Sequence, residues 1–246
     1  VSGGEQVGPV SGGEQVGPVS GGEQVGPVSG GEQVGPVSGG IVSAEQLERA
    51  VGLASRGRAL LGITGEPGAG KSTLSQALLV ALAGRGVRTA LVGMDGFHIA
   101  HRALTELGLV EIKGAPITFD AAGYVSLLRR LRDPAEQLVW APEFRREIED
   151  AIQSAVPVHP DVQLVLTEGN YLLADGPWRP VRDLCDEIWY VDVPEELRRQ
   201  RLAARHEFYG RTPEQAWERT LGSDERNAET VTATKGLADL VVTLGG

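Results

Sequence analysis

This chain of 246 residues has little cysteine, little lysine and no long apolar run. Its single cysteine, Cys185, rules out an internal disulfide, and we expect it to be a small core residue. No group of cysteines and histidines has the spacing of metal ligands. Because the chain has no run of about 18 apolar residues and does not start with a basic and then apolar segment, we expect a soluble, cytoplasmic protein without a membrane partner.

Positive charge is in the minority and is carried almost entirely by arginine. The formal net charge is -10, which argues against a nucleic-acid partner. The only lysines are Lys71, Lys113 and Lys235. A lysine inside a glycine-rich loop, as Lys71 is, therefore stands out.

The first 40 residues repeat one nonapeptide, Val-Ser-Gly-Gly-Glu-Gln-Val-Gly-Pro, four times without change and begin a fifth copy. This sequence offers no apolar face to bury, so we predict a flexible tail over residues 1–40 and a single domain over residues 41–246. The segment Ser-Gly-Gly-Glu-Gln resembles the signature of ABC-type ATPases. That signature follows the phosphate loop, whereas these copies precede it, so we interpret the likeness as accidental.

The most informative segment is a complete phosphate loop, G-x-x-x-x-G-K-[ST], between an apolar run at 59–64 and a helical pattern at 74–82. Its glycines let successive N–H groups turn toward a phosphate at the start of a helix. We expect Lys71 to reach the β- and γ-phosphates and the Ser72 hydroxyl to coordinate Mg²⁺. The loop predicts ATP binding by Gly65, Glu66, Pro67, Gly68, Ala69, Gly70, Lys71, Ser72 and Thr73.

Strands and helices alternate along the rest of the chain. This order predicts an α/β fold of the P-loop NTPase type, a mostly parallel sheet with helices on both faces, whose ligands lie at the carboxyl ends of the strands. Further strands are predicted at 88–92, 163–167, 187–192 and 238–244, and helices at 43–56, 120–132, 195–208 and 213–221.

Two acidic residues and a group of arginines are candidate catalytic residues. Asp95 and Glu168 each follow a predicted strand, so Asp95 could accept a hydroxyl proton and Glu168 could orient Mg²⁺. A turn-capping Asp and an ion-paired Glu are equally open alternatives. Arg201 and Arg205 share a helix face with Arg198, and this face could close over the phosphates as a lid or be solvated surface.

Six motifs, in order, resemble the family of phosphoribulokinase, uridine kinase and type I pantothenate kinase, particularly a bacterial branch of sugar or nucleoside kinases. The resemblance spans about residues 45 to 244. The motifs are Gly-Glu-Pro-Gly-Ala-Gly-Lys-Ser-Thr (65–73), Asp-Gly-Phe-His (95–98), Lys-Gly-Ala-Pro-Ile-Thr-Phe-Asp (113–120), Ala-Pro-Glu-Phe (141–144), Glu-Gly-Asn-Tyr-Leu-Leu (168–173) and Arg-Leu-Ala-Ala-Arg-His (201–206).

The resemblance implies a role for individual residues. Asp95 would be the catalytic base, and Lys71 would contact the phosphates. Ser72 and Glu168 would be the Mg²⁺ partners, and Arg201 and Arg205 would be lid arginines. The same motifs imply that the acceptor substrate is bound by Asp95, His98, Lys113, Phe144, Glu168, Asn170 and Tyr171.

The acceptor is less well defined than the reaction. Uridine kinases typically have an Asp where this chain has Gly114, which disfavours uridine; a sugar such as fructose or a related polyol is the favoured substrate, with uridine, cytidine or pantothenate as alternatives. Arg145 stands where related sequences often have Asp, and could favour an anionic substrate or weaken activity. We expect a small hydroxyl compound as the partner, and a homodimer is possible.

Two alternatives belong to other functional classes. A metallochaperone-type GTPase can have the same loop, but the guanine-binding [NT]-K-x-D is not matched by the nearest segment, Thr234-Lys235-Gly236-Leu237. The second alternative is a regulator that binds a nucleotide without turning it over. Measuring turnover together with binding would distinguish the regulator from a kinase.

Overall fold

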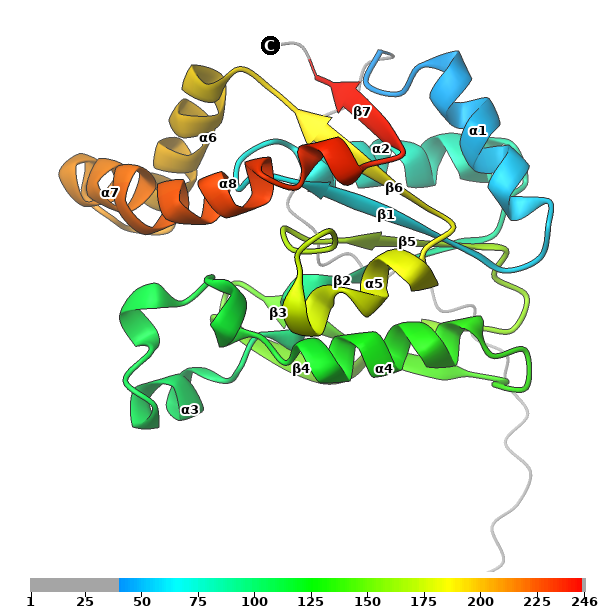
Figure 1. The fold of residues 1–246 in the computed structure, drawn as a ribbon, viewed down its shortest axis with the longest axis horizontal. Coiled ribbons are helices and arrows are strands. Elements are labelled where there is room, and N and C mark those ends of the chain that lie inside the picture. Colours follow the sequence, from blue (N-terminus) through cyan, green and yellow to red (C-terminus); the bar gives the residue numbers. More distant parts are fainter. Residues whose placement is uncertain (1–39, 245–246) are drawn as a thin grey trace, which may run out of the picture. The chain divides into compact units, whose positions relative to one another are not determined.

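A parallel β-sheet forms the centre of the part of the chain that the computed structural model describes, residues 40–244 (Figure 1). Within these residues the sheet has the strand order β2-β5-β1-β6-β7, and every neighbouring pair is parallel. The predicted parallel sheet is confirmed, at nearly the predicted residues. The strands are β1 (Ala59–Gly65), β2 (Thr89–Gly93), β5 (Leu164–Glu168), β6 (Glu187–Asp192) and β7 (Leu240–Thr243).

The described residues belong to one compact unit. The tail predicted for residues 1–40 lies outside the described residues, apart from Gly40. Among residues 40–244, no helix has both the length and the apolar character needed to cross a membrane.

Helices cover both faces of the sheet, as predicted (Figure 1). Alternate residues of a strand point to opposite faces, and β1 is buried along its whole length. Leu61 and Ile63 therefore join a core with one pair of helices, and Leu60 joins a second core with another pair. The first pair is α1 (Ala44–Ala54) and α2 (Lys71–Gly84), and the second is α4 (Ala121–Arg132) and α5 (Pro180–Leu184).

Helices α6 (Glu195–Phe208), α7 (Pro213–Arg219) and α8 (Glu225–Thr232) lie together at the carboxyl end of β6, at the left of Figure 1. A turn of π-helix, Thr220–Asp224, joins α7 to α8. The sequence predicted α6 and α7 but not α8, because α8 is short and polar and follows Gly222.

Side-chain caps set several helix starts. Ser43 with Gln46 forms the predicted capping box of α1, and Thr212 with Gln215 forms a second one at α7. The Asp120 carboxylate accepts a backbone N–H at the start of α4. These caps explain why the helix starts could be predicted closely from the sequence.

An antiparallel hairpin of β3 (Val139–Arg145) and β4 (Asp150–Val158) was not predicted. Its register shifts between Ala141 and Glu143, around Pro142, and most side chains of β4 are at least partly exposed. The period-two apolar pattern of a strand is therefore missing. The hairpin packs against the turn Met94–Phe97 at the carboxyl end of β2, and the short helix α3 (His101–Glu106) packs against the 3-10 turn Val110–Ile112.

Candidate active site

The phosphate loop links β1 to α2, with Lys71 as the first helical residue. Gly70 precedes the helix in a left-handed conformation (φ +94°), which favours glycine. At Gly68, a Cβ would lie 2.8 Å from the Arg198 carbonyl oxygen and 2.8 Å from Leu202 Cγ. Only glycine therefore lets α6 pack directly against the loop.

The Lys71 side chain folds back onto the loop and is close enough to two carboxylates to be affected by their charge. Its ammonium donates to the carbonyl oxygens of Gly65 and Glu66, each at 3.0 Å. Burial lowers the pKa of Lys71 to about 8, which the negative charges of Glu168 and Asp95 oppose. The long-range effects on its pKa show that Lys71 shares one electrostatic environment with both carboxylates.

This lowered pKa predicts a pH-dependent affinity for ATP. A bound triphosphate favours the ammonium form and raises the pKa of Lys71, so binding takes up a proton above about pH 8. The dissociation constant should then rise with pH, by up to about tenfold per pH unit. Titrating ATP in EDTA between pH 7 and 9.5 measures this. Lys71→Arg keeps its charge and should abolish the dependence; a flat wild-type profile would contradict the prediction.

Glu168 ends β5, the strand between β1 and β2, and this position brings it beside the loop. The Ser72 hydroxyl donates to its carboxylate, with oxygens 3.1 and 3.3 Å away. Burial raises the pKa of Glu168, and the Lys71 charge opposes this. A hydroxyl and a carboxylate are hard oxygen donors of the kind Mg²⁺ takes together with water and phosphate. The predicted pair Ser72 and Glu168 therefore suits that ion.

Asp95 lies in a 3-10 turn, Met94–Phe97, directly after β2. Its side chain is 38% exposed and lies 3.7 Å from an Arg146 nitrogen. The Asp95 charge raises the pKa values of both Lys71 and Glu168. The carboxyl ends of β1, β2 and β5 thus bring together the phosphate loop, Asp95 and Glu168, the candidate groups that each lie at the end of a predicted strand.

Aromatic rings and two cations adjoin Asp95. The His98 ring lies 4.0 Å from Phe119 and 4.9 Å from Phe144 between centroids. Lys113 Nζ is 5.2 Å and the Arg146 guanidinium carbon 5.8 Å from the Phe144 centroid. The structure therefore places the predicted residues His98, Lys113 and Phe144 in one cluster beside Asp95.

The other two residues predicted to bind the acceptor substrate, Asn170 and Tyr171, each take part in a hydrogen bond between a side-chain hydroxyl and a backbone carbonyl. The Tyr171 hydroxyl donates to the Gly114 carbonyl at 2.6 Å, and its ring is buried. The backbone carbonyl of Asn170 accepts from the Thr64 hydroxyl at 3.1 Å. Tyr171 thus fixes the segment after Lys113.

The sequence singled out Arg145, but its neighbour lies closer to the site. Arg145 pairs with Glu143 at 3.6 Å and Glu147 at 3.5 Å, whereas Arg146 pairs with Asp95. The only sequence signal for Arg146 was its position after the Ala-Pro-Glu-Phe motif.

The three arginines of α6 that the sequence predicted on one helix face have different surroundings. Arg198 is buried, with Nε 2.6 Å from Glu66 and Nη2 2.8 Å from Glu225, so it is neither a free lid residue nor solvated surface. The charge of Arg205 helps to lower the pKa of Lys71, so it lies near the phosphate loop. Arg201 is exposed and lines a cavity next to that loop.

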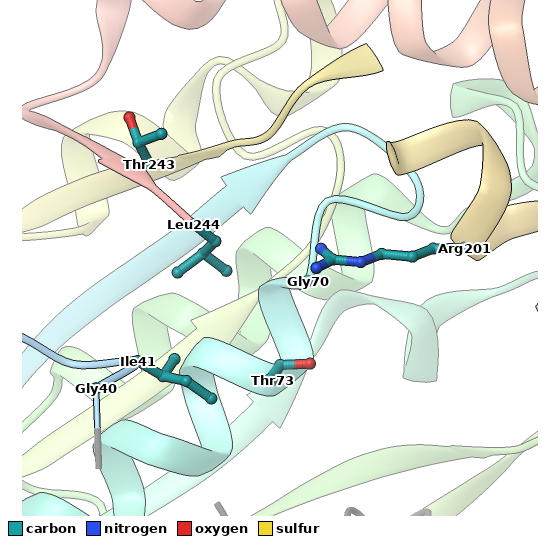
Figure 2. A pocket seen from close by; sticks show the side chains of 7 residues that line it. All are labelled: Gly40, Ile41, Gly70, Thr73, Arg201, Thr243 and Leu244. Atoms are coloured by element: carbon teal, nitrogen blue, oxygen red, sulfur yellow. The ribbon is translucent and has the colours of Figure 1, made fainter. Parts of the chain in front are cut away.

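That cavity has a volume of about 460 Å³ and opens beside the start of α2 (Figure 2). Its walls come from the loop, from α6 and from both ends of the described chain, so the sequence motifs could not identify it. It is lined by Gly40, Ile41, Gly70, Thr73, Arg201, Thr243 and Leu244.

Among family profiles, that of the methylmalonyl-CoA mutase-associated GTPase MeaB matches residues 38–99. This segment contains α1, the phosphate loop and the Asp95 turn. It omits the Glu168 segment and all of α6 to α8, so the match concerns the nucleotide-binding unit alone.

Two relatives that each cover about four fifths of the chain are described as "putative" kinases. A Schizosaccharomyces pombe protein named "Putative uridine kinase" is 34% identical over 208 residues, 80% of this chain and 88% of its own length. The crystal structure of a "putative fructose transport system kinase" from Silicibacter sp. TM1040 has 36% identity and a TM-score of 0.73, covering 79% of this chain and 97% of that one. The pantothenate kinase of Serratia proteamaculans is 32% identical over 149 residues, but these cover 56% of this chain and 46% of that enzyme.

The parallel sheet, the complete phosphate loop and the carboxylates at neighbouring strand ends define a P-loop kinase, an ATP-dependent phosphotransferase. The chain belongs to the family of P-loop kinases that includes phosphoribulokinase, the uridine kinases and type I pantothenate kinase. The predicted fold, family and enzyme class are confirmed.

Proposed function

We propose that the enzyme transfers the γ-phosphate of ATP to a hydroxyl of a small metabolite, most favourably a sugar such as fructose or a related polyol. One observation carries the assignment of the site: Lys71, the Ser72–Glu168 pair and Asp95 gather at the carboxyl ends of three adjacent strands. A phosphate cradle, donors for a metal and a base are what phosphoryl transfer requires.

In the proposed reaction the Asp95 carboxylate orients the acceptor hydroxyl and takes its proton as the oxygen attacks the γ-phosphorus. The bond from that phosphorus to the β–γ bridging oxygen breaks, and ADP leaves. Lys71, Arg201 and Arg205 offset the negative charge that develops on the phosphoryl oxygens. Mg²⁺, when bound by the Ser72 hydroxyl and the Glu168 carboxylate, supplies further neutralisation of the phosphates.

The cavity beside the loop is where we place the nucleoside part of ATP. It adjoins Gly70 and Thr73, so a nucleotide whose phosphates occupy the loop can extend into it, and its volume suits a group of that size (Figure 2). The Arg201 guanidinium borders both the cavity and the loop. One side chain can thus contact the nucleotide near its phosphates.

The acceptor class draws support from the names of the relatives, which include sugar, uridine and pantothenate kinases. Measuring ADP release by the full chain with Mg-ATP, against fructose, other sugars, nucleosides and pantothenate, tests the proposal. Strong stimulation by one compound would support it and identify the acceptor. ATP binding without stimulation by any of them would favour a nucleotide-binding regulator.

Glu168→Gln should raise the Mg²⁺ concentration for half-maximal activity by about 10- to 100-fold, because an amide is a weaker partner for the ion and its water. A magnesium titration at saturating ATP measures this. Glu48→Gln is the control, since Glu48 is exposed and pairs with Arg85 on the surface. An unchanged magnesium requirement in Glu168→Gln would remove Glu168 from the metal site.

A further inference from the structure

We propose that the acceptor carries an anionic group besides its hydroxyl, so that within the sugar and polyol class a phosphorylated or carboxylated compound is preferred to fructose itself, and that Lys113 and Arg146 bind this group beside the Phe144 ring. The inference rests on the proposed function, since it defines the chemistry of the acceptor. A carboxylate and a phosphate ester share the chemistry that these side chains recognise.

Two cations from different segments converge on one aromatic ring. Lys113 follows the turn Val110–Ile112, Arg146 follows β3, and both lie within 6 Å of the Phe144 centroid, at 5.2 and 5.8 Å. A ring face attracts each cation, but the cations repel one another. Glu149 and Asp95 each offset one of these charges at 3.7 Å, and an anion bound beside the ring would offset both.

The present partners of both cations leave donors for a ligand. Arg146 Nη2 is 3.7 Å from Asp95 Oδ2, and Lys113 Nζ is 3.7 Å from Glu149 Oε2, so both ion pairs are longer than hydrogen bonds. The Glu149 carbonyl accepts from Lys113 at 2.5 Å. An ammonium has three hydrogens and a guanidinium five, so a carboxylate or phosphate can still be bound.

The segment that carries Lys113 is held from several sides. Arg219 of α7 donates to the carbonyls of Lys113 at 2.8 Å and Glu111 at 3.2 Å. The Tyr171 hydroxyl donates to the Gly114 carbonyl. The Lys113 side chain is 13% exposed, so its ammonium has a defined position and little entropy is lost on binding a ligand.

The short distance between Arg146 and Asp95 limits how far the anionic group of the acceptor can lie from its reacting hydroxyl. Arg146 contacts Asp95, so an anion bound by Arg146 lies close to the hydroxyl that reacts there.

His98 is in the same cluster, and burial lowers its pKa, assisted by the charges of Lys113 and Arg146 and opposed by Asp95. A neutral imidazole suits this position because it adds no third positive charge. Its Nδ1–H donates to the Asp95 backbone carbonyl at 2.9 Å, so its Nε2 is left to accept a hydrogen bond from a hydroxyl of the substrate.

Three pairs of acceptors test the inference with the full chain and Mg-ATP: pantothenate and pantothenol, glycerate and glycerol, fructose 6-phosphate and fructose. In a pair that is turned over, we expect kcat/KM to favour the anionic member by about 10- to 100-fold, as for hydrogen bonds to a charged group. The first two pairs test a carboxylate and the third a phosphate ester. Binding of each compound in the presence of a non-hydrolysable ATP analogue is measured in parallel.

Variants connect the preference to the cluster. Lys113→Met and Arg146→Gln should each lower kcat/KM for the anionic member more than for the neutral one, reducing the preference by about tenfold. Arg145→Gln should retain the preference, since Arg145 pairs with Glu143 and Glu147. Binding of the ATP analogue checks that each variant is folded. If only one of Lys113→Met and Arg146→Gln folds, that variant alone is enough to test the preference for the anionic member.

The outcomes separate this inference from the kinase proposal. Equal or better use of a neutral member would overturn the anionic acceptor and leave the kinase intact. Binding of an anionic member without turnover would support the site and oppose the kinase proposal. If no anionic member either binds or reacts, the inference fails.

Discussion

Asp95→Asn is expected to lower kcat by about 100- to 10,000-fold, the usual contribution of a general base, and to leave ATP binding near the wild-type value. Asparagine keeps the shape of the side chain but cannot take the hydroxyl proton. Its neutral amide also removes a negative charge that raises the pKa of Lys71, so ATP binding should be compared at pH 7, where Lys71 is protonated. Single-turnover phosphate transfer and ATP calorimetry measure the two quantities.

Asp161→Asn serves as the control for this experiment. Asp161 is exposed and pairs with Arg88 at 3.2 Å, outside the group around the phosphate loop. It should retain both transfer and binding. Phosphate transfer at the wild-type rate in Asp95→Asn would mean that another group accepts the hydroxyl proton, or that the reaction needs no general base.

The core of the site could be predicted because its signals are local. The phosphate loop is a continuous segment, and its conformation depends on its own glycines and on the helix that follows. Asp95 and Glu168 are far apart in the sequence, but Asp95 lies just after β2 and Glu168 ends β5, and parallel strands bring their carboxyl ends to one edge. One topological rule therefore places both carboxylates beside Lys71.

Residues that depend on packing could not be placed in the same way. Arg145 and Arg146 are adjacent, and only the path of the chain after β3 decides which of them contacts Asp95. Helical spacing put Arg198 on one face with Arg201, but it does not show what that face contacts. The unpredicted helix α8 supplies Glu225, and this carboxylate makes burial of Arg198 possible.

Arg198→Met should cost about 3–5 kcal/mol of unfolding free energy, the loss typical of breaking a buried ion pair. Arg198 is 1% exposed and joins Glu66 of the phosphate loop to Glu225 of α8. Methionine fills much of the space but leaves both carboxylates, each about one fifth exposed, without this cation. We expect the lower end of the range because Glu225 keeps Arg199, at 2.9 Å. Chemical denaturation of the full chain measures the change.

Arg199→Met is the matched control, because Arg199 shares Glu225 but is 27% exposed and also pairs with Glu195. Its loss should destabilise the fold far less than the loss of Arg198, as for a surface pair. Glu66 lies in the loop that holds the phosphates, so Arg198→Met should also weaken ATP binding, whereas Arg199→Met should not. Equal stability and equal ATP affinity in the two variants would mean that Arg198 only fills space; the expected difference would show that α6 and α8 hold the phosphate loop in its binding conformation.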